Sequence, residues 1–91
     1  MGHSVLNGAG ERVILALGES NYEIIRRRNN ASGSITVQGD EIVFWPSTVC
    51  DGTGTYRWSL TGDSLTFTTL IRDGCPGRSE VLAGQTYGPL R

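Results

Sequence analysis

The chain has 91 residues, which is enough for one small domain with a single core. Eight arginines against nine acidic residues give a formal net charge of −1, which argues against a nucleic-acid groove because such a groove needs a basic excess. There is no lysine and the one histidine is His3, so a phosphate-binding loop and a histidine-dependent catalytic dyad or triad are excluded. Two cysteines and one histidine are too few for a zinc site, and no apolar run approaches the roughly 18 residues of a membrane span.

The N-terminal residues are expected to lie outside the core. We interpret residues 1–10 as a flexible N-terminal tail, in which His3 is consistent with a sequence added in cloning. Met1 to Gly10 lack the basic start and apolar middle of a signal peptide. Residues 11–91 are predicted to form a single domain.

Short apolar runs separated by turn residues dominate the rest of the chain. Glycine accounts for 13 of the 91 residues, about twice its average share of roughly 7%, so many tight turns are expected. The runs predict strands at Arg12–Leu17, Asn21–Arg28, Gly33–Gln38, Glu41–Trp45, Gly54–Thr61 and Ser64–Ile71, and a last strand at Ser79–Thr86 that Gly84 interrupts. Strands at this spacing favour a sandwich or barrel, with helix only as a short turn near either end.

An internal repeat favours a barrel over a sandwich. Residues 35–44 align without gaps with residues 58–67, and each segment carries a central Gly-Asp pair between apolar-alternating arms. Gly39-Asp40 and Gly62-Asp63 are therefore predicted to be two-residue hairpin turns. Consecutive hairpins of one shape close most easily into a barrel without exposed edges. The predicted fold class is all-β, a small antiparallel up-and-down barrel of about seven or eight strands.

Alternation along the strands separates an inner from an outer face. The inner face is predicted to hold Val13, Leu15, Leu17, Tyr22, Ile24, Ile35, Val37, Ile42, Phe44, Tyr56, Trp58, Leu60, Leu65, Phe67 and Ile71. The outer face still carries five apolar residues, Ile14, Ile25, Val43, Trp45 and Leu70. Such a stripe is typical of a partner surface, for example in a homodimer, or of a face left bare when a covering segment is missing.

The second half of the chain resembles a known family. Residues 54–67 and then Asp73-Gly-Cys75-Pro-Gly-Arg78 are similar to the patterns G-x-Y-x-W-x-L-x-G-D-x-L-T-[FL] and D-x-C-x-x-R of small lipocalin-like (calycin-type) β-barrel domains of actinobacteria. The resemblance covers residues 12–87. Members often have a further N-terminal helix and strand and a Trp-containing closing motif, where this chain has Gln85-Thr-Tyr87-Gly-Pro. The resemblance implies a barrel that binds small apolar molecules, although a few barrel relatives in polyketide pathways act as cyclases.

The two cysteines each follow one hairpin of the repeat, which would place them at the same end of a barrel. A Cys50–Cys75 disulfide would close a loop of about 25 residues and contribute on the order of 3 kcal/mol. It would imply an oxidising compartment, so that the protein would be secreted or on the cell surface. Two buried thiols in a cytoplasmic protein are the alternative, and a reactive thiol has neither lysine nor histidine beside it. Asp73 is expected to pair with Arg78, as in the D-x-C-x-x-R pattern.

Five residues are the candidate ligand-binding set. The inward-facing Tyr22, Tyr56, Trp58 and Phe67 either line an apolar cavity or simply fill the interior, since about eight strands leave space for side chains or one small ligand. Arg26 begins a run of three arginines; it would either clamp a ligand carboxylate at the barrel mouth or stay solvated and paired with Glu or Asp.

The leading hypothesis for function is non-catalytic binding of a small hydrophobic or amphipathic molecule inside the barrel. One alternative is a cofactor-free cyclase that folds a polyketide-type chain in the cavity, which needs shape more than a triad. Another is a protein-interaction or accessory domain. No catalytic residue, metal, cofactor, nucleic-acid partner or membrane span is predicted, and whether the protein is an enzyme stays open.

Overall fold

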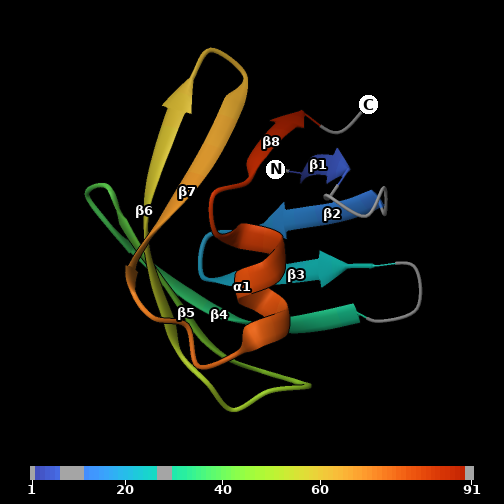
Figure 1. Cartoon of the computed structure of the whole chain (residues 1–91), viewed down its shortest axis with the longest axis vertical. Coiled ribbons are helices and arrows are strands. Elements are labelled where there is room, and N and C mark those ends of the chain that lie inside the picture. The colour runs from blue at the N-terminus through green and yellow to red at the C-terminus, as the bar shows by residue number, and fades with distance from the viewer. Residues whose placement is uncertain (1, 7–11, 27–29, 90–91) are drawn as a thin grey trace.

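The computed structural model describes residues 2–6, 12–26 and 30–89. Within these ranges eight strands pair antiparallel in chain order, and the last pairs with the first, so the sheet closes into a barrel (Figure 1). This confirms the predicted all-β up-and-down barrel. The elements are β1 (Gly2–Leu6), β2 (Arg12–Leu17), β3 (Asn21–Ile25), β4 (Asn30–Gln38), β5 (Glu41–Ser47), β6 (Gly54–Thr61), β7 (Ser64–Ile71), α1 (Pro76–Leu82) and β8 (Thr86–Pro89).

The repeated hairpins form as predicted. Gln38 pairs with Glu41 in the β4–β5 hairpin, and Thr61 pairs with Ser64 in the β6–β7 hairpin, so each Gly-Asp pair is a two-residue turn. Gly39 has a φ of 62° and Gly62 a φ of 58°, whereas no non-glycine residue of the described chain has a positive φ. A positive φ at only the first turn residue is the type II′ geometry, which matches the twist of the flanking strands.

Two sequence predictions at the ends of the chain are wrong. Residues Gly2–Leu6, which we expected in a flexible tail, form β1 and pair with both β2 and β8. This short segment has no clear alternation of its own, so only closure of the barrel along both of its edges makes it a strand. The remaining tail residues, 1 and 7–10, lie outside the described residues.

The segment predicted as a strand at Ser79–Thr86 is instead the end of α1 and a connection to β8. Pro76 occupies the start of the helix, where its missing N–H costs nothing. Arg78, Val81 and Leu82 are its buried residues, and their spacing places them on one helical face. Gly84 follows the C-cap with a φ of 70°, the left-handed conformation that ends many helices.

Other boundaries differ by a few residues. β4 begins at Asn30 rather than Gly33, and β5 continues to Ser47 rather than ending at Trp45. The strand predicted at Asn21–Arg28 ends at Ile25, while residues 27–29 lie outside the described residues. Among the residues described, no helix is long and apolar enough to cross a membrane.

The predicted inner face forms the core. Ten of its members are buried, namely Val13, Leu15, Tyr22, Ile24, Ile35, Ile42, Phe44, Tyr56, Leu65 and Phe67. Val81, Leu82 and Tyr87 join them from the C-terminal segment. Ile71 is exposed, contrary to the prediction, because the β6–β7 register shifts next to Thr55 and reverses the faces beyond that point.

The outer apolar residues do not form one stripe. Ile14 and Ile25 pair across β2 and β3, whereas Val43 and Trp45 lie on β5 and Leu70 lies on β7. On the intervening β4, Asn30 lies opposite Ile25 and Thr36 lies opposite Val43, so Ile25 and Val43 are six residues, or roughly 20 Å at about 3.3 Å per residue, apart along this strand. A dimer through these residues stays a prediction.

Candidate functional site

The barrel has two different ends (Figure 1). We call the end with the β2–β3, β4–β5 and β6–β7 turns the hairpin end, and the end with the β5–β6 connection and the start of α1 the loop end. Between them the interior is filled by edge-to-face aromatic rings, with centroid distances of 5.0 to 6.3 Å. These rings belong to Tyr22, Phe44, Tyr56, Phe67 and Tyr87. The candidate residues Tyr22, Tyr56 and Phe67 are therefore buried and pack against other rings.

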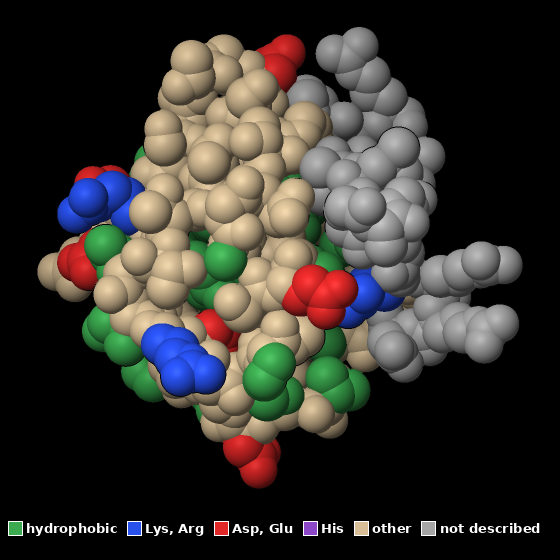
Figure 2. All heavy atoms as spheres, in the orientation of Figure 1, with side chains coloured by type: hydrophobic (Ala, Val, Ile, Leu, Met, Phe, Trp, Pro, Cys, Tyr) green, Lys and Arg blue, Asp and Glu red, His purple; other side chains and the backbone are tan. Residues whose placement is uncertain are grey.

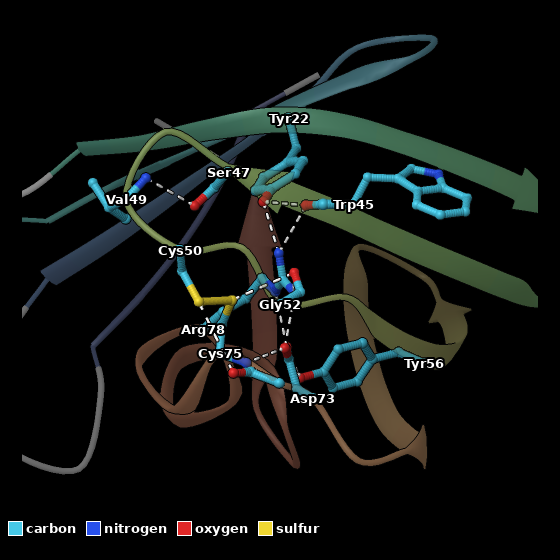
Figure 3. Close-up of a disulfide and its surroundings, with 11 residues drawn as sticks. Tyr22, Trp45, Ser47, Val49, Cys50, Gly52, Tyr56, Asp73, Cys75 and Arg78 are labelled. Carbon is cyan, nitrogen blue, oxygen red and sulfur yellow. Dashed lines mark hydrogen bonds and ion pairs between the residues drawn. A yellow bond between two sulfur atoms is a disulfide. The ribbon is translucent and has the colours of Figure 1, made fainter.

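The loop end is organised around a buried ion pair between Asp73 and Arg78 (Figure 3). The guanidinium donates through Nε to Oδ2 and through Nη2 to Oδ1, both at 2.8 Å, which is the bidentate geometry of a strong pair. Its other hydrogens reach Tyr22 Oη at 2.9 Å, the Trp45 carbonyl at 3.0 Å and the Gly52 carbonyl at 2.8 Å. All five guanidinium N–H groups thus have acceptors. The expected pairing of Asp73 with Arg78 is confirmed.

The Asp73 carboxylate is equally saturated. Besides Arg78, the Tyr56 hydroxyl donates to Oδ2 at 2.7 Å and the Cys75 backbone N–H donates to Oδ1 at 2.8 Å. Burial opposes ionisation, but the hydrogen bonds from Arg78, Tyr56 and the Cys75 N–H outweigh it and hold the pKa of Asp73 below its ordinary value. Burial and the bond to Asp73 raise the pKa of Tyr56 well above the ordinary tyrosine value. The pair is charged and its tyrosine neutral at physiological pH.

Glycines and a disulfide hold this network in place. A Cβ on Gly54 would lie 2.5 Å from Asp73 Oδ2, and one on Gly52 would lie 2.5 Å from the Gly74 carbonyl carbon, so both positions need glycine for close approach. Cys50 and Cys75 form the predicted disulfide, which joins the β5–β6 connection to the residue preceding α1 (Figure 3). The G-x-Y and D-x-C-x-x-R motifs are therefore one structural unit.

A cleft of about 440 Å³ lies beside this network, between α1 and strands β3 to β5. We call it the helix cleft. Tyr22, Ile24, Arg26, Ala31, Ser47, Val49, Cys50, Cys75, Pro76, Gly77, Arg78 and Val81 line it. Arg26 Nη2 lies 4.0 Å from Glu80 Oε1 of α1, so the sequence alternative of pairing with an acidic residue is realised. On the face of the molecule in Figure 2, hydrophobic side chains lie mainly in the lower half, among scattered charges of both signs.

A second hollow of about 280 Å³ opens at the hairpin end. We call it the mouth. Its lining is apolar: Leu17, Gly18, Ile35, Val37, Ile42, Trp58, Leu60, Leu65 and Phe67. Val37 is 49% exposed and Leu60 is 53% exposed although both occupy the inner face by alternation. The Trp58 indole N–H donates to the Gly39 carbonyl at 3.0 Å, and the Trp58 backbone N–H donates to the Asp40 carbonyl at 2.8 Å, so this side chain also fixes the β4–β5 turn.

The five candidate residues are thus not brought together. Tyr22 and Arg26 line the helix cleft, Trp58 and Phe67 line the mouth, and Tyr56 lies between them on Asp73. Sequence reasoning missed the contribution of α1, whose Val81 reaches the helix cleft. The three- and four-residue spacing from Arg78 to Val81 and Leu82 was the available signal.

The described residues contain no group of three or more His, Cys, Asp or Glu side chains able to hold a metal ion. Comparison of the chain with known protein families, with curated proteins and with solved structures gives no match. The case for function therefore depends on the two cavities.

Proposed function

We propose that this protein is a non-catalytic binding protein that takes a small, largely apolar molecule into the mouth of its barrel. The observation that carries the proposal is the exposure of Val37 and Leu60, two inner-face side chains that the protein leaves open to solvent. Apolar area kept in contact with water costs about 25 cal/mol per Å² relative to burial, so an apolar ligand gains by covering it. The resemblance to lipocalin-like barrels supports the same class of function.

The lining favours an uncharged ligand. None of the residues that line the mouth carries a titratable side chain, and the Trp58 N–H already donates to Gly39. The volume lies near the lower limit of about 300 Å³ for ligand pockets, which favours a small molecule or one end of a longer one. The cyclase alternative gains no support here, because the polar groups of the Asp73–Arg78 network are all engaged with one another.

The Cys50–Cys75 disulfide indicates the kind of compartment in which the protein would bind its ligand. Disulfides persist mainly in oxidising compartments and are rare in the cytosol. We therefore expect the protein to act outside the reducing cytosol, where a small barrel that carries an apolar compound would keep that compound in solution.

The test uses an uncharged fluorescent probe, N-phenyl-1-naphthylamine, titrated into the protein. Probe emission should rise on binding, and in a Trp45→Phe background the remaining Trp58 emission should fall as the probe fills the mouth. Leu60→Ser should weaken binding about tenfold, since it removes most of one apolar contact. Ile71→Ser is the matched control, because Ile71 is exposed but does not line the mouth. Absence of binding, or equal affinity in Leu60→Ser and Ile71→Ser, would overturn the proposal.

A further inference from the structure

The helix cleft differs from the mouth in its chemistry. It is lined by apolar groups from three directions, Ile24 of β3, Ala31 of β4 and Val81 of α1, but it also contains Arg26 and Ser47. Its volume of about 440 Å³ falls within the range of small-molecule sites. A cavity with apolar walls and a few polar groups suits a ligand that has both an apolar body and a polar group.

The charged side chains that line the helix cleft are both arginines. Its lining contains two arginines and no acidic residue. The charge of Arg78 is neutralised by the bidentate bond to Asp73, so Arg26 is the arginine of the lining that a ligand anion would meet. Arg26 has a side chain only 23% exposed, and its contact with Glu80 is long and mostly exposed on the Glu80 side. Exposed pairs of this kind contribute little free energy, so a ligand carboxylate can compete with Glu80.

A second polar group lies on the loop wall. The Ser47 hydroxyl oxygen accepts from the Val49 N–H at 3.2 Å, and its hydrogen can still be donated into the cleft. The disulfide and the backbone bond from the Ser47 N–H to the Cys50 carbonyl at 2.8 Å hold this wall in position. The Ser47 hydroxyl is therefore presented by a fixed wall, which lowers the ordering cost of binding.

From these observations we propose that the helix cleft is a second site that binds a small amphipathic organic acid. The carboxylate lies on the Arg26 guanidinium, and the hydrocarbon body packs on Ile24, Ala31 and Val81. Because this site lies at the loop end and the mouth at the hairpin end, with the aromatic core between them, the two sites are independent. Charge separates their ligands: an acid at the helix cleft and an uncharged molecule at the mouth.

Octanoate and 1-octanol form the probe pair, since they share a chain and differ in charge. Isothermal titration and methyl chemical shifts should show octanoate binding, with perturbed Ile24 and Val81 methyls. Arg26→Gln should weaken octanoate about tenfold and leave any 1-octanol binding unchanged. Arg57→Gln is the matched control, because it removes the same charge from a residue paired with Asp40 outside the cleft and should leave octanoate affinity unchanged.

Two further variants keep the test decisive. Val49→Asp places a negative charge on the exposed loop wall and should weaken octanoate even if Arg26→Gln folds poorly. Leu60→Ser should weaken N-phenyl-1-naphthylamine but not octanoate, so failure at the mouth is distinguishable from failure here. The proposal is overturned if Arg26→Gln and Arg57→Gln behave alike, or if octanoate affinity follows Leu60 instead of Arg26.

Discussion

The two ends of this barrel differ in how completely their side chains are satisfied. At the loop end the Asp73–Arg78 pair is buried and fully hydrogen-bonded, and a disulfide fastens the surrounding loop. At the hairpin end apolar side chains of the inner face stay open to solvent. Tyr56 and Trp58 illustrate this contrast. They lie two residues apart on the same face of β6, but the Tyr56 hydroxyl donates to Asp73 at the loop end, whereas Trp58 lines the mouth at the hairpin end.

The difference shows where the stability of the domain resides. A buried ion pair compensates for its desolvation only when its geometry is good and its remaining hydrogen-bonding groups are satisfied, as those of Asp73 and Arg78 are. Such a network fixes one arrangement of α1 against the barrel. The mouth, by contrast, contributes less to stability than it would if its apolar side chains were fully buried. A bound apolar ligand could supply this missing burial.

The largest predicted effect is loss of the buried pair. Arg78→Met should lower the free energy of unfolding by about 3–5 kcal/mol, because it leaves the Asp73 carboxylate buried without its partner. Arg57→Met is the control, since the exposed Arg57–Asp40 pair at 3.1 Å should be worth at most about 1 kcal/mol. Denaturant unfolding measures both. Equal losses in the two variants would mean that the loop end is not the stabilising end.

The pH dependence of stability checks the same pair. The pKa of Asp73 is depressed in the folded protein, so its stabilising contribution is complete above the unfolded value of about 3.9 and is lost as the pH falls through the lower folded value. Asp73→Asn should remove this part of the acid sensitivity and unfold more easily at neutral pH. An unchanged acid profile in Asp73→Asn would contradict the assignment.

The next largest effect is loss of the disulfide. Replacing both Cys50 and Cys75 by Ser should cost about 3 kcal/mol by the chain-entropy estimate for a loop of this length. At temperatures where the variant stays folded, octanoate binding at the helix cleft should weaken while probe binding at the mouth persists. Reductant should leave the stability and binding of the variant unchanged. In the wild type, reductant should lower the stability and the octanoate affinity to those of the variant. A loss of mouth binding instead would show that the two ends are coupled.

Much of the fold was predictable because the deciding signals are local. The Gly-Asp turns and the alternation of the β4–β5 and β6–β7 hairpins are properties of adjacent residues, and they form as expected. β1 was not predictable, because this five-residue segment becomes a strand only through its pairing with β2 and with β8 near the C-terminus. α1 was missed although Pro76 and the spacing of its buried residues indicated it, since Val81 and Leu82 also fit a strand.

The candidate site was predicted less well for a geometric reason. Alternation tells which face of a strand a side chain occupies, but not its height along the barrel axis. Tyr22, Tyr56, Trp58 and Phe67 all face inward as predicted, and yet they are divided between the helix cleft, the aromatic core and the mouth. The height depends on register and strand tilt, which are settled by pairing across the whole sheet.

The smallest predicted effect lies at the mouth, where two leucines form a matched pair. Leu60 and Leu65 face each other across β6 and β7, but Leu60 is 53% exposed and Leu65 is 7% exposed. Leu65→Ala should therefore cost about 2–3 kcal/mol in unfolding free energy, whereas Leu60→Ala should cost less than about 1 kcal/mol. In the presence of saturating N-phenyl-1-naphthylamine the cost of Leu60→Ala should grow, because the ligand stabilises the wild type more than the variant. If Leu60→Ala already costs as much as Leu65→Ala without ligand, the mouth is closed in solution and the contrast between the two ends disappears.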